Sequence, residues 1–489
     1  MSKRASDSTK YNPRAAHCIT RGIWGIIGIY ILLYLFCLIA YHGIHDNYLF
    51  NDDFSWLHEA RHGMESANLI TYRVVNFFRP LVNLSFYLLE RISPGNIHLN
   101  YTLNLILHFL NTVLVFRLIC VLLGSRRIAF ATAVVFALTS VHTGAVFWIS
   151  ARTTLLSAFF LLASLTLIAS NSNSGLPRII GSIALYILAL ASKETAIAGM
   201  LLVPLLFVLH KKRGAERSFR AEVLVSFTAV SAIYLIIRKV VMGGFIQYNW
   251  GPGAHVLRNL AGGLLYKLYP WPIFSLFAPS ATRIPEPGHP FIPEIVAIPL
   301  VLLLFWIGRS IKQPHEFDFA VGWTVLALLP ASLFRYRFFS TESITQNRYY
   351  YLSSVGSVLV IVLLLSILWR SASRLWRTVT VFLFVILCAG YMARIDRLEK
   401  KWDSFTSMYR EVVVTMIDEA EKFTGFSTIA IEDSPLAFPY IEDAIALTHP
   451  EWRIVEVPGG RDEAARWKPC LYVSYTGEKP KLMRMEKLE

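Results

Sequence analysis

The stretch that decides the fold is residues 22–40, which read GIWGIIGIYILLYLFCLIA and contain no charged side chain. A helix of about 20 apolar residues spans the hydrocarbon core of a bilayer, because its backbone hydrogen bonds are all satisfied within the segment. The stretch is long for the core of a signal peptide, and no small-residue cleavage site follows it. We therefore expect a retained transmembrane helix at this position.

Composition extends this expectation to the rest of the chain. Of the 489 residues, 55% are apolar and 16% are charged, and the mean hydropathy is +0.48, values that soluble domains rarely show. We expect an all-α polytopic membrane protein with about 11 transmembrane helices, at residues 22–41, 99–123, 127–148, 153–170, 178–192, 195–210, 221–241, 294–308, 318–334, 349–369 and 377–394.

Basic residues predict the orientation of these helices. They gather in the short loops of one side, at Lys3, Arg4, Lys10, Arg14, Arg21, Arg126, Arg127, Arg178, Lys211, Lys212, Arg213, Arg217, Arg220, Arg309, Lys312, Arg370, Arg374 and Arg377. Loops rich in Lys and Arg remain in the cytoplasm. We expect a multi-pass protein of the cell (inner) membrane, with a cytoplasmic N-terminus and an extracytoplasmic C-terminal tail. The net charge of +14 is dispersed between the spans, so we expect no nucleic-acid partner.

The chain divides into three parts on this basis. A cytoplasmic segment, 1–21, precedes a transmembrane domain, 22–394, which carries two long outer loops at 42–98 and 242–293. The first of these loops contains amphipathic stretches that suit helices lying along the membrane surface. The tail, 395–489, has the pattern of a small α/β domain, with helices at 402–423 and 438–447 and strands at 427–431, 452–457 and 470–475.

Two adjacent carboxylates, Asp52 and Asp53, open the first outer loop. Such a pair can supply a general base and a partner that orients the acceptor, and we expect Asp53 to be the base. The alternative is that Asp53 caps the helix that begins at Phe54, since Asp is a preferred helix cap.

A motif typical of zinc proteases follows the acid pair. His58-Glu59-Ala60-Arg61-His62 fits H-E-x-x-H, in which two imidazoles one helical turn apart hold the metal. No convincing third ligand follows, so an HExxH zinc membrane protease is an alternative only. A secondary transporter is another, although the hydropathy shows neither parallel halves nor paired broken helices.

Polar side chains line one face of the second span. Asn100, Asn104, His108 and Asn111 follow one another at helical spacing. In lipid, such a stripe must face protein or water. Hydrogen bonding between helices and a ligand pocket are the two interpretations.

Cations near the outer ends of the spans depart from the topology rule. Arg152, Lys193 and Arg348 are among them, and Arg348 precedes Tyr349 at the start of the tenth span. An arginine there suits a phosphate, because its fork of donors matches the oxyanions. Side chains that only reach the interface are the alternative.

Taken in order, these pieces resemble one family. The colinear set covers about residues 45–360 and comprises Asp52-Asp53, Arg79-Pro80-Leu81, Asn104 to His108, Val141 to Arg152, Ser192-Lys193-Glu194, Leu329-Pro330 and Arg348-Tyr349 to Gly356. The chain is similar to polytopic glycosyltransferases of the GT-C fold, such as the transmembrane and tetratricopeptide-repeat O-mannosyltransferases and their bacterial relatives. It departs from their pattern at Thr139-Ser140, Gly144 and Thr154, and it lacks the repeats.

The resemblance implies transfer of a monosaccharide from a polyprenyl-phosphate donor to a protein or glycan hydroxyl on the outer face. The chemistry of the residues agrees, because Asp53 and Asp52 can act as the catalytic pair and an inverting displacement is the simplest scheme. We expect membrane lipid as a further partner. The donor phosphate would meet Arg348, Lys193, Arg152 and Arg79, and the pocket would include His142, Glu194, Tyr349, His108 and Asn104. We assign no cofactor and no metal ligand. A divalent cation near the acid pair is left open, because no closed ligand set is visible.

Overall fold

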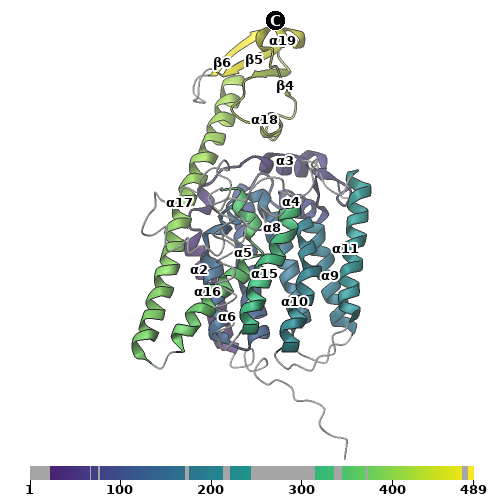
Figure 1. Cartoon of the computed structure of the whole chain (residues 1–489). Coiled ribbons are helices and arrows are strands. Elements are labelled where there is room, and N and C mark those ends of the chain that lie inside the picture. The colour runs from purple at the N-terminus through teal and green to yellow at the C-terminus, as the bar shows by residue number, and fades with distance from the viewer. Residues whose placement is uncertain are drawn as a thin grey trace, which may run out of the picture.

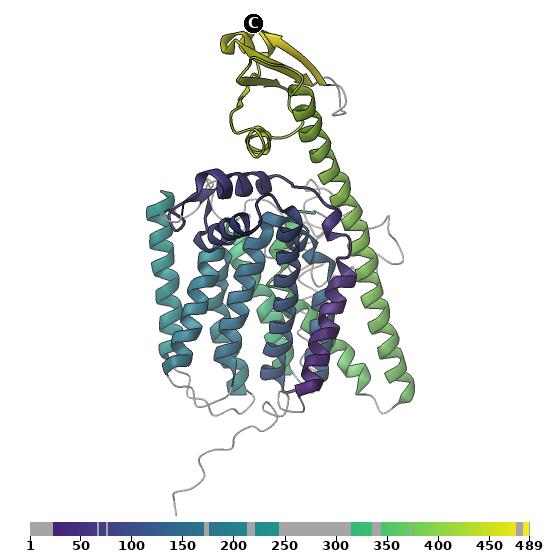
Figure 2. The ribbon, with the colours of Figure 1, turned by 180° about the vertical axis from the view of Figure 1, so that it is seen from behind.

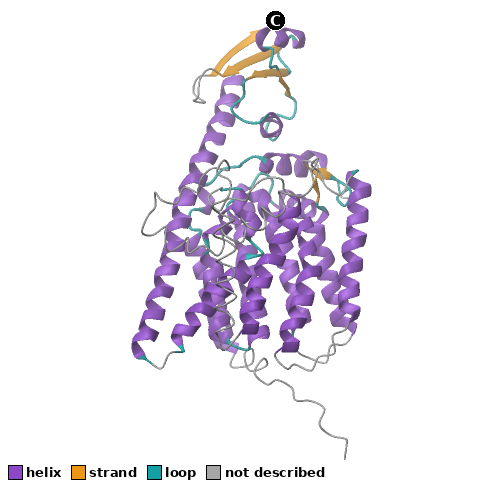
Figure 3. Ribbon diagram, viewed as in Figure 1, coloured by secondary structure: helices purple, strands orange, loops and turns teal. Residues whose placement is uncertain are grey.

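The computed structural model describes residues 23–65, 68–74, 77–170, 176–212, 221–243, 314–334, 344–370, 373–475 and 483–488. Helices make up most of this part of the chain (Figure 3). They are α2 (Ile23–Ala40), α3 (Asp52–His58), α4 (Pro80–Ile92), α5 (Ile97–Leu123), α6 (Arg126–Leu138), α7 (Thr143–Val146), α8 (Arg152–Ala169), α9 (Leu176–Ser192), α10 (Ala198–Lys212), α11 (Ala221–Met242), α15 (Pro314–Phe334), α16 (Ser354–Trp369), α17 (Arg374–Ala420), α18 (Phe438–Ala446) and α19 (Gly460–Ala464).

The apolar helices stand side by side in one bundle. In Figures 1 and 2, α3 and α4 lie across one end of it, and the C-terminal strands lie beyond that end. Five helices of the described chain are long and apolar enough to cross a membrane, or six if one bent pair counts as a span. The expected span 294–308 and the outer loop 242–293 lie outside the described residues, apart from the last residues of α11 and Gly243. The other expected spans overlap helices, several of them shorter than a full crossing.

The span expected at 127–148 is not one continuous helix. α6 ends at Leu138, Thr139 is extended, and a short turn (η3, Ser140–His142) leads into α7 at an angle of 54°. A further turn, η4 (Ile149–Ala151), connects α7 to α8. Residues 139–151 therefore form a break between two membrane helices, and we call this segment the break.

One helix replaces two expected elements at the end of the chain. The predicted span 377–394 and the predicted amphipathic helix 402–423 are both parts of α17, which runs for 47 residues. Between Tyr391 and Trp402 the sequence contains neither Gly nor Pro and is rich in strong helix formers, so nothing ends the helix at the predicted boundary.

The tail beyond α17 contains a four-stranded sheet. Its strands are β3 (Thr428–Glu432), β4 (Arg453–Glu456), β5 (Cys470–Tyr475) and β6 (Met483–Leu488), in the order β4-β3-β5-β6. β3 pairs in parallel with β4 and β5, whereas β5 and β6 are antiparallel. The first three coincide with predicted strands, and β6 was not predicted. A two-stranded antiparallel ribbon of β1 (Arg73–Val74) and β2 (Phe77–Phe78) lies between α3 and α4.

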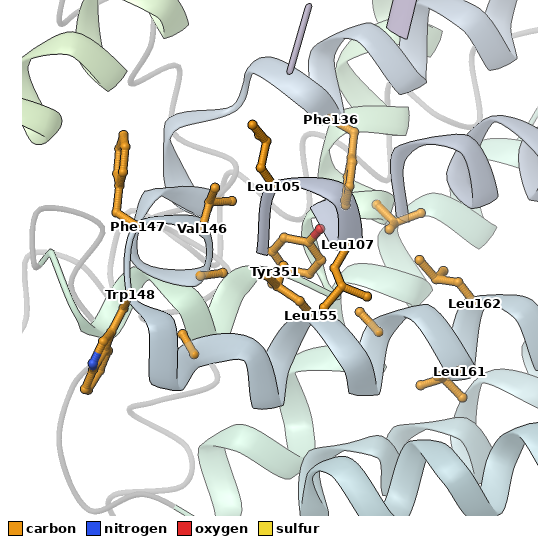
Figure 4. Close-up of a cluster of buried hydrophobic side chains, with 14 of the residues drawn as sticks. Leu105, Leu107, Phe136, Val146, Phe147, Trp148, Leu155, Leu161, Leu162 and Tyr351 are labelled. Atoms are coloured by element: carbon orange, nitrogen blue, oxygen red, sulfur yellow. The ribbon is translucent and has the colours of Figure 1, made fainter. Parts of the chain in front are cut away.

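Buried apolar side chains pack tightly around the break. Figure 4 shows Val146, Phe147 and Trp148 of the break beside side chains of α5, α6 and α8, with Tyr351 among them. All of these labelled side chains are at most 6% exposed. The core thus fixes a segment of short, bent helical turns at the end of the bundle that carries α3.

Candidate functional site

The acid pair stands at the start of α3, and the break holds it there. The Trp148 indole donates a hydrogen bond of 3.1 Å to the Phe50 carbonyl, just before the helix. Asn51, the residue before α3, has a positive φ of 48°, which Asn tolerates better than most residues. The chain therefore turns sharply against the break before the carboxylates begin.

Asp53 is buried, and both of its carboxylate oxygens accept hydrogen bonds from the chain. Its Oδ1 accepts hydrogen bonds from the backbone N–H of Ser150, at 2.7 Å, and from the Ser150 hydroxyl, while Oδ2 accepts one from the Phe50 N–H at 3.1 Å. Burial raises the pKa of Asp53 to about 7, and the bonds to Ser150 and Phe50 oppose that rise. The residue we expected to be the base thus joins α3 to the break.

Asp52 is only partly buried and lines a cavity. Its Oδ1 accepts a 2.9 Å hydrogen bond from the Tyr440 hydroxyl of α18. Of the two carboxylates, Asp52 is the one that can approach a bound molecule.

The cavity gathers most of the predicted site residues. Its lining consists of Asp52, Phe77, Arg79, Trp148, Ser150, Ala151, Thr153, Lys193, Glu194, Arg348 and Tyr349. Its volume is about 30 Å³, room for one or two water molecules. A sugar phosphate can therefore bind only if side chains that now fill the space move aside.

Arg79 and Glu194 form an ion pair in the cavity wall. Arg79 Nη2 lies 3.2 Å from Glu194 Oε1, and the Arg79 guanidinium stacks 3.9 Å above the Phe77 ring. Arg79 is 7% exposed, so the pair is largely shielded from water.

Lys193 and Arg348 both line the cavity and both lie against the Tyr349 ring. Lys193 Nζ donates a 2.7 Å hydrogen bond to the Thr154 hydroxyl and lies 5.0 Å from the centre of the Tyr349 ring. Arg348 stacks on Trp148 at 4.1 Å and on Tyr349 at 4.8 Å. Thr154 stands where the family pattern has an acid, so this partner of the Lys193 ammonium brings no negative charge.

A second small cavity continues from the first toward the bundle interior. It shares Lys193, Arg348 and Tyr349 and extends along mostly small or apolar side chains, namely Thr154, Ser157, Ala158, Thr195, Ala327, Ala331 and Leu352. The cations thus stand where a polar and a mainly apolar hollow meet.

Arg152 does not line either cavity. It is fully buried, and its guanidinium donates to Asn100 Oδ1 at 2.6 Å and to Asn104 Oδ1 at 3.3 Å while stacking on Phe86. Arg152 was one of the four cations expected at the donor phosphate, but in the structure its side chain connects α8 to α5.

The polar stripe of α5 supports the break. Asn104 donates to the Trp148 carbonyl at 2.9 Å, and Asn111 donates to the Leu155 carbonyl at 3.0 Å. His108 lies 3.2 Å from the Ala137 carbonyl and 2.8 Å from the Tyr351 hydroxyl. Irregular backbone at membrane depth needs such partners, because no water is present to satisfy it. Asn104 and His108 therefore serve the fold rather than line the cavity.

His142 ties the break to α16. Its Nε2 lies 2.7 Å from the Ser354 hydroxyl, and its ring packs against Phe136 and Tyr351. Nearby, Asn347 accepts from the Gly144 N–H at 2.9 Å and donates to the Thr143 hydroxyl at 2.7 Å. A Cβ on Gly144 would lie 2.2 Å from Asn347 Oδ1. These contacts fix the turn that presents Arg348.

The zinc-protease-like motif forms contacts with other parts of the chain. His58 Nδ1 lies 3.3 Å from Asp443 Oδ1 of α18, and Glu59 accepts a hydrogen bond from the Tyr72 hydroxyl. In the described ranges, no group of three or more His, Cys, Asp or Glu side chains could hold a metal ion. Near the acid pair, Asp53 accepts three hydrogen bonds and Asp52 accepts one. Few carboxylate oxygens are therefore available there as ligands for a cation.

Sequence analysis did not find Ser150, Asn347 and Tyr440, three residues that position the site. Ser150 and Asn347 lie within or beside quoted motifs, but their partners are 97 and 203 positions away. Tyr440 is 388 positions from Asp52. No local sequence pattern marks pairs of residues that lie so far apart in the chain.

Comparisons with known proteins address the fold. No family model matches the chain. The chain is 25% identical to the protein O-mannosyl-transferase Tmtc3 of Drosophila melanogaster over 467 aligned positions, which cover 76% of the chain. It spans about half, 50%, of the length of that relative.

Two solved structures share the architecture. One is ArnT from Cupriavidus metallidurans bound to undecaprenyl phosphate, with a TM-score of 0.51 and 10% identity over 93% of this chain and 94% of that one. The other is the apo oligosaccharyltransferase of Archaeoglobus fulgidus, with a TM-score of 0.51 and 13% identity over 89% of this chain and 65% of that one. The predicted resemblance is confirmed: the chain has the fold of the GT-C membrane glycosyltransferases.

Proposed function

We propose that this protein is a membrane glycosyltransferase that moves a monosaccharide from a polyprenyl-phosphate donor to a hydroxyl acceptor. The observation that carries the proposal is the cavity wall, in which the half-buried Asp52 shares one small space with Arg79, Lys193 and Arg348. A carboxylate suits a general base, and the cations suit a leaving phosphate. The relative with the O-mannosyl-transferase name supports the reaction class.

In the proposed chemistry Asp52 is the base and Asp53 positions it, which reverses the roles expected from the sequence. Asp52 takes the proton of the acceptor hydroxyl as its oxygen attacks the anomeric carbon, and the bond from that carbon to the phosphate oxygen breaks. The polyprenyl phosphate leaves with the bonding electrons, and the configuration at the sugar inverts. Asp53 positions Asp52, because its bonds to Ser150 and Phe50 fix the first turn of α3.

The cations are proposed to stabilise the phosphate as negative charge develops on it. Arg348 and Lys193 stand where the two cavities meet, so the sugar phosphate would enter the polar hollow and the first isoprene units would lie along Ala158, Ala327 and Ala331. Arg79 would exchange part of its contact with Glu194 for the phosphate. ArnT, which shares the fold, is described in complex with undecaprenyl phosphate, a lipid of this class.

Helix α3, which carries Asp52 of the cavity, and α18 lie at the end opposite the starts of α6, α9 and α17 (Figure 1). Arg126, Arg178 and Arg374 lie in the first turns of those three helices. We propose that the basic end faces the cytoplasm and the cavity faces the outer side of the cell membrane, in keeping with the positive-inside rule. A protein or glycan acceptor would then approach beside α18.

A transfer assay tests the proposal. The purified protein is mixed with synthetic polyprenyl-phosphate sugars and hydroxyl acceptors, and the released polyprenyl phosphate is measured together with the glycosylated product. Transfer from at least one donor is expected. Full activity of the Asp52→Asn variant would contradict the assigned base. Proteolysis of a substrate without sugar transfer would revive the protease alternative.

A further inference from the structure

A large cleft lies at the end of the bundle away from the acid pair. It has a volume of about 620 Å³ and is enclosed by the start of α6, the end of α16 and the start of α17. Small-molecule sites typically measure ~300–1,000 Å³, so the cleft is large enough for a ligand. In both views, α17 stands at the edge of the bundle (Figures 1 and 2), so the cleft lies beside an outer helix.

The lining of the cleft is amphipathic. Apolar side chains from all three helices cover most of it, including Ile128, Phe130, Ala131, Leu365, Val381 and Phe384. Arg127, Arg370 and Arg377 also line it, and each lies within a few residues of a helix end. The arginines thus lie toward the helix ends, and apolar side chains make up the rest of the wall.

The two sequence segments that build the cleft are basic. Residues 124–131 and 362–384 contain neither Asp nor Glu. Arginine pairs well with the phosphate oxygens of an anionic headgroup, because its donors form a planar fork. Trp369 also lines the cleft, and tryptophan favours the interfacial region of a bilayer.

We propose that this cleft binds one anionic phospholipid, with its phosphate among Arg127, Arg370 and Arg377 and an acyl chain along the apolar wall. The site is separate from the proposed donor site, whose lining residues lie at the opposite end of the bundle. The lipid would fill the space between α17 and α6 and so hold α17 in place. This inference does not depend on the proposed sugar transfer.

Native mass spectrometry of the purified, delipidated chain tests the site with phosphatidylglycerol and phosphatidylcholine as probes. One phosphatidylglycerol is expected to remain bound where phosphatidylcholine does not. The double variant Arg127→Gln/Arg377→Gln should weaken that binding by about tenfold or more, since each basic residue near an anionic headgroup contributes measurably. Arg374→Gln is the matched control, because Arg374 lies one turn from Arg377, is exposed and does not line the cleft.

A second variant separates the cleft from general surface charge. Ala131→Trp keeps every arginine but fills the apolar wall, and it should also reduce phosphatidylglycerol binding. Melting temperatures of the delipidated variants check that the fold is kept. Equal losses in Arg374→Gln and the double variant would overturn the proposal, as would equal retention of phosphatidylcholine. Displacement of the bound lipid by equimolar polyprenyl phosphate would likewise overturn it, by assigning the cleft to the other lipid.

Discussion

The hydroxyl of Tyr440 donates a 2.9 Å hydrogen bond to Oδ1 of Asp52, across 388 positions of sequence. The bond joins α18, in the C-terminal unit, to the carboxylate that lines the cavity. Other contacts accompany it: Ser55 donates to Asp443, and Arg61 donates to the Leu447 carbonyl. The C-terminal unit is thus docked on α3 directly above the candidate site.

Removal of this bond should slow transfer without unfolding the protein. Tyr440→Phe keeps the ring but frees Asp52 to rotate, and loss of a hydrogen bond to a charged group corresponds to ~1.5–3 kcal/mol, or about 10- to 150-fold in turnover if fully expressed. Steady-state kinetics with varied acceptor should show the loss mainly in kcat. Tyr472→Phe is the control, because its hydroxyl bonds to Glu432 within the sheet. Parallel losses in both variants would indicate a structural effect only.

The two acids should respond differently to the same substitution. Asp52→Asn removes the proposed proton acceptor and should lower turnover by roughly two to four orders of magnitude with little change in melting temperature. In Asp53→Asn, the side-chain NH2 group would face an N–H donor of Ser150 or Phe50 in place of an accepting oxygen. The substitution should therefore destabilise the fold by ~1–3 kcal/mol. Ser150→Ala should act like the Asp53 variant. Transfer rates and thermal unfolding, measured on the same preparations, distinguish the two effects. A stable but inactive Asp53→Asn together with an active Asp52→Asn would restore Asp53 as the base.

Substitutions of Arg348 should show whether donor binding needs the paired N–H donors of arginine or only a positive charge. Arg348→Ala is expected to weaken donor binding more than Arg348→Lys, since lysine keeps the charge but loses the stacking on Trp148 and Tyr349. Lys193→Ala should act in the same direction. Binding of a synthetic polyprenyl-phosphate sugar measures the effect, and Arg397→Ala, on the exposed face of α17, is the control. Unchanged affinity in all the cavity variants would remove these cations from the site.

Docking of α18 should weaken as pH rises. The pKa of His58 is raised above its ordinary value of 6.5, chiefly by the hydrogen bond to Asp443 and with help from the charges of Glu59 and Glu442, while burial opposes the shift. A raised pKa in the docked state means that the contribution is complete below about pH 6.5 and is lost as pH passes the raised value.

Hydrogen exchange of α18 between pH 5.5 and 8.5, corrected for intrinsic rates, measures this docking. Protection should fall with pH in the parent protein and vary less in His58→Gln. His62→Ala is the matched control, because no hydrogen bond or ion pair joins the neighbouring His62 to α18 among the described residues, and burial lowers its pKa. Both variants should keep transfer activity within about tenfold, since loss of a peripheral contact corresponds to ~1 kcal/mol. A pH dependence that persists in His58→Gln would contradict the assignment.

Sequence patterns predicted local features well and distant partners poorly. Hydropathy located the apolar helices, and strand patterns located β3, β4 and β5, because both depend on neighbours in sequence. The polar stripe was found, and of its two interpretations hydrogen bonding is the one that the structure shows for Asn104. Its partners, backbone carbonyls of the break 42 to 45 positions away, could not be named from sequence. The roles of Asp52 and Asp53 could not be separated, because only the fold shows which side chain turns toward Ser150.

The continuous helix α17 has a mechanical consequence. At ~1.5 Å per residue its 47 residues extend for about 70 Å, with no Pro and only one Gly, Gly390, along the way. The bundle part of α17 and the part below the sheet are thus one continuous rod. A tilt of that rod would shift Tyr440 relative to Asp52, so the orientation of α17 in the bundle and the docking of α18 on α3 are mechanically coupled.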